Sequence, residues 1–247
     1  MIKLKADKDY DPQDSVHFPP ERHTEFYKTC KKLVGKYGDR IINLYTSPDL
    51  RFKIFHELKC TSTNAFIITK LMQDNTYSTT CLNGSKMFKI ELDNHFMKGL
   101  NIGMRTFIDF GYFHSVFMFT EDTLRRMLRI LDLNACNKGT AEFKNIYECL
   151  LKKINLQKYS KLLDVCRLIR NSIHSNGEYN HKSFVDANIV YKKKKFIFKI
   201  GKPIRFDEWN FVDKYDFFVF LLNEICEMFE KIIESKMIKT IPNKELV

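Results

Sequence analysis

The sequence predicts a mainly α-helical protein, a helical bundle with a β-hairpin inserted before the last helix. Only 9 of its 247 residues are Gly and 6 are Pro, about half of their average share. This scarcity argues against a β-sandwich with many tight turns and against a Gly-rich nucleotide-binding domain. Hydrophobic residues make up 44% of the chain and aromatic residues 14%, which excludes low-complexity disorder. Most apolar residues recur at a spacing of three or four, as in helices that face a core.

The first third of the chain is predicted to contain a polar arm and three helices. Residues 1–18 are polar, and residues 21–45 carry apolar side chains at helical spacing, among them Phe26, Val34, Tyr37 and Ile41. The pair Ser47-Pro48 is typical of a helix start. We therefore expect a short helix from there to about residue 58 and another over residues 63–72.

The middle of the chain is predicted to hold an irregular insert followed by long helices. Residues 74–100 show no clear period and favour an irregular insert or a short two-strand element, with a strand at 87–92. Residues 101–131 have a mostly helical period, and Thr120 with the following Glu121 predicts an internal cap that divides this helix. The helical pattern resumes at about Thr140.

The last third is predicted to be a helix, a hairpin and a final helix. Residues 159–175 have a helical period, whereas residues 188–191 and 195–200 alternate as strands do, which predicts a β-hairpin over 188–200. A short extended piece at 204–206 and a helix over 211–236 follow. No repeat or linker is visible, so we favour one domain. Within it we distinguish residues 1–100, an N-terminal helical region of unknown role, from residues 101–247.

Charge and cysteine usage limit the partners and the compartment. Lys and Arg number 41 against 30 Asp and Glu, a net charge of +11, which indicates either a polyanionic partner or a solvated Lys-rich surface. The 7 cysteines are too far apart for CxxC motifs. No signal peptide or apolar run of membrane-spanning length is present. We expect a soluble, cytoplasmic protein with reduced thiols and no membrane partner.

Common catalytic motifs are missing. The sequence has no P-loop, no GxGxxG, no HExxH and no GxSxG. Its 7 histidines are scattered, and no two of them lie four residues apart with a carboxylate partner. The sequence therefore predicts neither a metal site nor a cofactor.

One segment, residues 162–177, gathers polar groups at the end of a predicted helix. Leu162, Cys166, Ile169 and Ile173 form an apolar stripe, and Gly177 is a helix stop. Arg170 and His174 lie four residues apart and therefore share a face, and Arg167 is one turn earlier.

This combination suits phosphodiester chemistry. A guanidinium can hold two phosphate oxygens, and an imidazole can transfer a proton at neutral pH. Together they could deprotonate a ribose 2′-OH and stabilise a charged phosphorane without a metal. The alternative is that Arg170, Asn171 and His174 only cap the helix, with Arg170 in an ion pair.

The segment RNSIHSNG (170–177), after an amphipathic helix, resembles the motif of HEPN domains, helical ribonuclease domains of prokaryotic defence and toxin–antitoxin systems. The resemblance covers about residues 101–237. It implies a HEPN-like bundle of four or five helices that forms a homodimer through the 159–175 helix and cleaves RNA without a metal. Two departures matter. Three residues separate Arg170 from His174 where the family has four to six, whereas six separate Arg167 from His174, so either arginine could be the functional one. Asn176 replaces the tyrosine of toxins that are controlled by AMPylation.

The resemblance implies a role for each residue of the motif. His174 would be the general base or acid, and Arg170 would hold the scissile phosphate. Asn171 would orient His174 or close the helix end. Arg167 and the run Lys192, Lys193, Lys194 and Lys195 would guide the RNA backbone, although such a run is also typical of a solvated hairpin turn. His181 is a further candidate for a proton carrier.

The sequence therefore leads to three hypotheses about function. The first is a metal-independent HEPN-type endoribonuclease in anti-phage defence or as a toxin, with an antitoxin or a phage-derived trigger as a further partner. The second is a non-catalytic HEPN-like dimerisation or RNA-binding module, which the short Arg170 to His174 spacing favours. The third assigns a sensing role to residues 1–100.

Overall fold

The computed structural model describes residues 20–42, 49–73, 83, 84, 86, 94–135, 142–175, 177–180 and 184–235. Within these ranges the chain forms six α-helices and one two-stranded antiparallel hairpin that precedes the last helix. The prediction of a mainly α fold with a hairpin before the last helix is confirmed.

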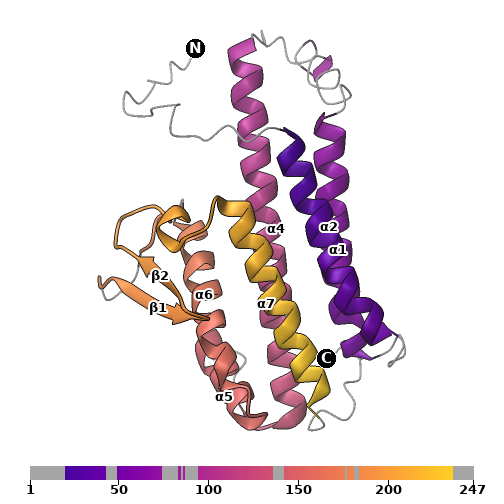
Figure 1. Ribbon diagram of the computed structural model, residues 1–247, viewed down its shortest axis with the longest axis vertical. Helices are drawn as coiled ribbons and strands as arrows, with labels where there is room; N and C mark the ends of the chain where they lie inside the picture. The colour runs from indigo at the N-terminus through magenta and orange to yellow at the C-terminus, as the bar shows by residue number, and fades with distance from the viewer. Residues whose placement is uncertain are drawn as a thin grey trace.

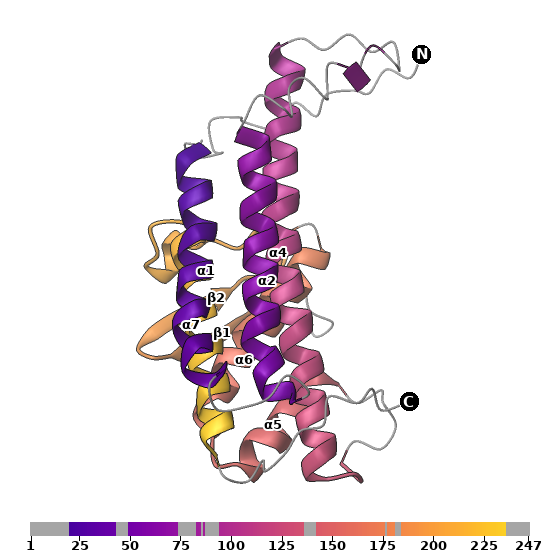
Figure 2. The ribbon, with the colours of Figure 1, turned by 90° about the vertical axis from the view of Figure 1, so that its right-hand side faces the viewer.

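The long helix α4 (Asn94–Leu131) runs through the length of the molecule. In Figure 1, α1 (Pro20–Ile42) and α2 (Leu50–Gln73) lie on one side of α4, and α5 (Phe143–Lys153) and α6 (Ser160–His174) lie on the other. Figure 2 shows α1, α2 and α4 side by side. No helix of the described ranges has both the length and the apolarity that crossing a bilayer requires.

A single hydrophobic core joins the two sides. Helix α1 packs on α7 (Lys214–Glu234), α2 packs on α4, and buried apolar side chains from Phe26 to Ile233 form one cluster. The predicted apolar stripe of α1 is buried at Phe26, Val34, Tyr37 and Ile41. The division proposed at residue 100 falls inside α4.

Helix α2 is continuous, so the prediction of two separate helices was wrong. Ser62 lies where the break was expected, but its Oγ donates to the carbonyl of Leu58 at 2.8 Å and is hydrogen-bonded to the Tyr112 hydroxyl at 2.9 Å. A hydroxyl that is satisfied by its own helix does not interrupt it. The expected cap at Ser47 lies outside the described residues. The carboxylate of Asp49 instead accepts the backbone N–H of Arg51 at the start of α2.

Helix α4 is not divided at Thr120, so the predicted internal cap was also wrong. The Thr120 hydroxyl donates to the carbonyl of Val116 at 2.8 Å rather than accepting a backbone N–H. Thr120 is fully buried, and this bond satisfies its hydroxyl inside the bundle. The predicted arm at 1–18 and the predicted strand at 87–92 lie outside the described residues.

Helices α5 and α6 are close to their predicted positions. A short 3₁₀ turn, η1 (Gln157–Tyr159), leads into α6, whose predicted stripe is buried at Leu162, Cys166 and Ile169. The helix ends as predicted, because Gly177 has φ 88° and its N–H donates to the carbonyl of Ser172 at 2.8 Å.

The predicted hairpin consists of β1 (Ala187–Tyr191) and β2 (Lys194–Phe198), with Ile189 opposite Phe196. Lys192 and Lys193 form the two-residue turn with φ values of 45° and 64°, the left-handed conformations of a type I′ turn. Four alternate side chains face the core: Ile189, Tyr191, Phe196 and Phe198. Trp209, in the 3₁₀ turn η2 (Asp207–Trp209), packs on Phe196 and Phe198 and donates its indole N–H to the carbonyl of Ile197 at 3.1 Å.

The final helix begins at Lys214, three residues later than predicted. Its N-cap is Asp213, whose Oδ1 accepts the N–H groups of Tyr215 at 2.7 Å and Asp216 at 2.9 Å. Asp213 also accepts from Arg22 of α1 at 2.6 Å. One carboxylate therefore both starts α7 and ties it to α1.

A buried polar cluster around Asp109 fixes the position of α1 on α4 and α7. The Asp109 side chain is 1% exposed and accepts hydrogen bonds from His23 Nε2 at 2.6 Å, the Tyr27 hydroxyl at 2.8 Å and the Tyr215 hydroxyl at 3.2 Å. Lys214 Nζ lies 2.6 Å from its second oxygen. Burial raises the pKa of Asp109, but the hydrogen bond from His23 and the charge of Lys214 outweigh it and hold the pKa below its ordinary value.

Candidate functional site

The predicted catalytic residues lie together at the C-terminal end of α6, where the helix meets α4. The Arg170 guanidinium lies over the ring of Phe117 on α4, with Cζ 5.8 Å from the ring centroid. Its Nη1 donates to Asn171 Oδ1 at 3.3 Å. This contact and the aromatic face fix the guanidinium without neutralising its charge.

Arg170 has no carboxylate partner in the part of the chain that the structure describes. Its Nε is buried and lacks a hydrogen-bond acceptor there. A buried N–H donor without an acceptor is costly, so a group that supplies one gains affinity. The positive charge of Arg170 is therefore available to an anion.

His174 meets a second histidine that the sequence reasoning missed. His174 is exposed at the end of α6, and its ring lies edge-on to the half-buried ring of His114 on α4, with centroids 5.3 Å apart and an interplanar angle of 89°. Burial lowers the pKa of His114, and the nearby His174 and Arg170 lower it further. The site thus brings two imidazoles and one guanidinium together from α4 and α6.

The spacing along the chain explains why His114 was missed. It lies 56 positions before Arg170 in the sequence, with neither a motif nor a carboxylate beside it. The available signal was the helical period of residues 101–131, which places His114 on the same face as Phe110, Phe107 and Met118. Only the packing of α4 on α6 shows that this face borders the end of the motif helix.

Arg167, also predicted as an RNA contact, is part of a buried network. Its Nη2 lies 3.7 Å from Asp164 Oδ1, and the same oxygen accepts the Tyr147 hydroxyl of α5 at 2.6 Å. The Arg167 side chain is 24% exposed. Arg167 therefore helps to hold α5 on α6, and only part of its surface reaches solvent.

The predicted lysines lie at the opposite end of α6. Lys192 borders a pocket of about 260 Å³ whose walls include Tyr159, the residue before α6. Ten helical residues separate the start of α6 from Arg170, a distance of about 15 Å. The lysine turn and the Arg170–His174 pair are thus separate surfaces.

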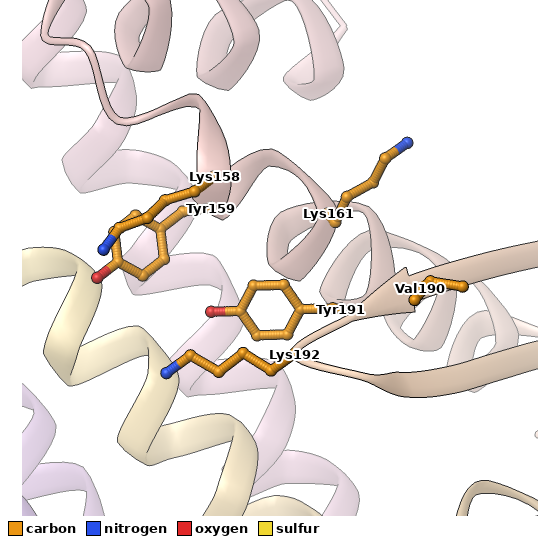
Figure 3. A pocket seen from close by; sticks show the side chains of 6 residues that line it. All are labelled: Lys158, Tyr159, Lys161, Val190, Tyr191 and Lys192. Atoms are coloured by element: carbon orange, nitrogen blue, oxygen red, sulfur yellow. The ribbon is translucent and has the colours of Figure 1, made fainter.

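Carboxylates of α7 hold one of these lysines. Lys192 Nζ lies 2.8 Å from Glu224 and 2.9 Å from Glu227. Figure 3 shows the Lys192 ammonium and the Tyr191 hydroxyl pointing to the same side of the pocket. The Tyr191 hydroxyl donates to Glu224 at 2.5 Å.

The other lysines of the turn are less constrained. Lys194 lies over the ring of Phe211 at 4.1 Å, while Lys193 and Lys195 are exposed. His181, the further proton carrier considered from the sequence, lies outside the described residues. Of the predicted RNA contacts, Lys193 and Lys195 are the most accessible.

The site as a whole offers acid–base groups and a cation. Across the described ranges, no three His, Cys, Asp or Glu side chains are grouped as metal ligands. No family model, no curated protein and no solved structure matches this chain.

Proposed function

We propose that the protein is a metal-independent endoribonuclease of the HEPN type that acts in anti-phage defence or as a toxin. The observation that carries the proposal is the pairing of an Arg170 guanidinium that has no carboxylate partner among the described residues with the exposed His174 one turn later. RNA supplies both an anionic phosphate and a 2′-OH that can attack it. No cofactor is needed for this reaction.

In this proposal each residue of the motif has one role. Arg170 binds the non-bridging oxygens of the scissile phosphate and stabilises the charge that develops on them. His174 transfers a proton as general acid or base. Asn171, which accepts from Arg170 at 3.3 Å, orients the guanidinium rather than the imidazole.

The RNA backbone extends from this site toward the hairpin. Lys193 and Lys195 are exposed and attract phosphates, and part of the Arg167 side chain is exposed one turn before Arg170 on α6. Because such contacts release counterions, binding weakens steeply as salt rises. Lys192 and Lys194 contribute less, since their ammonium groups already have partners in the fold.

A homodimer is part of the proposal, but most of α6 is buried within one chain. A second copy therefore reaches only the end of this helix, together with the adjoining face of α4. That face carries three large exposed apolar side chains in line with His114, namely Phe107, Phe110 and Met118. Exposed apolar patches of this kind are typical of interfaces. Phe107→Glu should dissociate the dimer in sedimentation experiments.

The test of the activity is cleavage of RNA by the purified full chain in EDTA. We expect wild-type protein to cleave and Arg170→Lys and His174→Gln to lose about 10²–10⁴-fold in rate. Arg205→Lys and His56→Gln are matched controls. Arg205 is 62% exposed and pairs with Asp207, and His56 is exposed on α2. Expression of the wild type, but not of the two site variants, should inhibit growth.

The second candidate function is a non-catalytic HEPN-like module that binds RNA or a partner protein. The spacing of three residues between Arg170 and His174 favours it, since the family usually has more. Binding of RNA without cleavage at any protein concentration would establish this function and exclude the nuclease.

A further inference from the structure

Cleavage of RNA by its own 2′-OH requires two proton transfers. One group removes the proton of the 2′-OH, and another protonates the 5′-oxygen that leaves. A single imidazole at the scissile phosphate can supply only one of these at a time. The structure places a second imidazole, His114, beside the first, with ring centroids 5.3 Å apart.

We infer that His114 is a second catalytic residue, the proton acceptor for the 2′-OH, while His174 is the proton donor to the leaving 5′-oxygen. This inference rests on the proposed ribonuclease function and assigns one proton transfer to each histidine. Both catalytic imidazoles then come from the same chain, one from α4 and one from α6.

The surroundings of the two rings support this division. Among the described residues, the charged and titratable groups that act on His114 are His174 and Arg170, both on α6. Burial and these two groups lower the pKa of His114, so its ring is neutral at neutral pH and is able to accept a proton. His174 is exposed at the last residue of α6, where its ring is accessible to a leaving group.

The two rings also restrain each other's charge. A positive charge on the neighbouring ring disfavours a proton on His114 and lowers its pKa. The permanent charge of Arg170 acts in the same direction. When the pair carries one proton, one imidazole can act as the base and the other as the acid, as the reaction requires.

The reaction balances with these groups alone. His114 takes the 2′-OH proton as the 2′-oxygen attacks phosphorus, the P–O5′ bond breaks, and the 5′-oxygen takes the proton of His174. Arg170 holds the two non-bridging oxygens meanwhile. The products are a 2′,3′-cyclic phosphate and a 5′-hydroxyl, and exchange with water restores the protons. The substrate class is therefore a phosphodiester with a free ribose 2′-OH.

The test compares His114→Gln, His174→Gln and the control His56→Gln on two substrates in EDTA. One is an ordinary oligoribonucleotide, and the other is uridine 3′-(p-nitrophenyl phosphate), whose leaving group needs no proton. We expect both site variants to lose about 10²–10⁴-fold on the oligonucleotide. On the nitrophenyl ester, His174→Gln should recover to about wild-type rate, whereas His114→Gln should stay slow.

The pH profile provides a second measurement. The wild type should show a bell-shaped dependence, His114→Gln should lose the limb at low pH, and His174→Gln should lose the limb at high pH. In addition, ¹³C-labelled histidine spectra of the non-catalytic variant His174→Gln should show a higher pKa for His114, because a neighbouring charge is removed. This measurement requires folding but no cleavage.

The outcomes separate this inference from the function on which it rests. If cleavage needs Arg170 and His174 but His114→Gln retains wild-type rate and pH profile, His114 is not catalytic and the nuclease assignment remains. If His114→Gln is rescued by the nitrophenyl ester, the roles are reversed and the inference is wrong as stated. If wild type cleaves neither substrate, the proposed ribonuclease function is wrong, and the role assigned to His114 is wrong with it.

Discussion

Replacing Asp109 by Asn should destabilise the protein strongly. The side chain is 1% exposed, and the substitution removes the charge that pairs with Lys214 at 2.6 Å while keeping the shape of the side chain. Breaking a buried ion pair by removing one partner costs about 3–5 kcal/mol. Lys214 is 27% exposed and reaches solvent, so the lower end, about 3 kcal/mol, applies. For a chain of this size, about 2–4 °C per kcal/mol gives a fall in Tm of roughly 6–12 °C.

The assay is thermal unfolding followed by far-UV circular dichroism, with Asp122→Asn as the matched control. Asp122 is on the same helix, but it is 53% exposed and pairs with Arg126 on the surface. Exposed pairs of this spacing contribute about 0.3–0.5 kcal/mol, so the control should lose about 2 °C or less. Equal Tm values for the two variants would refute the reasoning that Asp109 anchors α1.

The pH dependence of this difference follows from the same pKa shift. The pKa of Asp109 is lower in the folded protein than its ordinary value of 3.8. The carboxylate therefore contributes stability that is fully present above that value and is lost as the pH falls through the lower folded-state value. The difference in unfolding free energy between wild type and Asp109→Asn should shrink in acid, as urea titrations at several pH values would show.

Four further substitutions test other parts of the fold. Glu224→Gln should lower the free energy of unfolding by about 1–3 kcal/mol, because the Glu224 carboxylate is 3% exposed, accepts a hydrogen bond from the Tyr191 hydroxyl and pairs with the Lys192 ammonium. Urea unfolding measures this, and an unchanged midpoint would contradict it. Lys193→Gly should raise Tm by about 2–4 °C, since its φ of 64° suits glycine, and a fall would contradict the turn geometry. Gly177→Ala should cost about 1 kcal/mol because φ is 88°, whereas Gly111→Ala, in open space within α4, should stabilise by a similar amount.

The sequence predicted the helices best where apolar residues follow one period without interruption. The stripe of Leu162, Cys166 and Ile169 is buried as expected. The two breaks that were predicted but are absent lie at Ser62 and near Thr120. Both residues favour helix starts when their hydroxyls accept backbone N–H groups, yet here they donate to the carbonyl four residues earlier. Local sequence does not determine which of these bonds forms, because surrounding helices decide it.

The candidate site was predictable only where its members are close in sequence. Arg170 and His174 share a face because they are four residues apart, and this much followed from helical geometry. His114 joins them through the packing of α4 on α6, which no local pattern reports. The same limit applies to Lys192, whose partners Glu224 and Glu227 are more than 30 positions away.

Trp209 gives this protein a single local fluorophore. It is the one tryptophan in the sequence, it is fully buried, and it contacts Phe196 and Phe198 of the hairpin on one side and Phe217 of α7 on the other. Its emission therefore reports whether the hairpin is docked on the last helix. A red shift of this emission at constant helical ellipticity would mark detachment of the hairpin while the bundle stays folded, so the two events are separable by optical spectroscopy without any label.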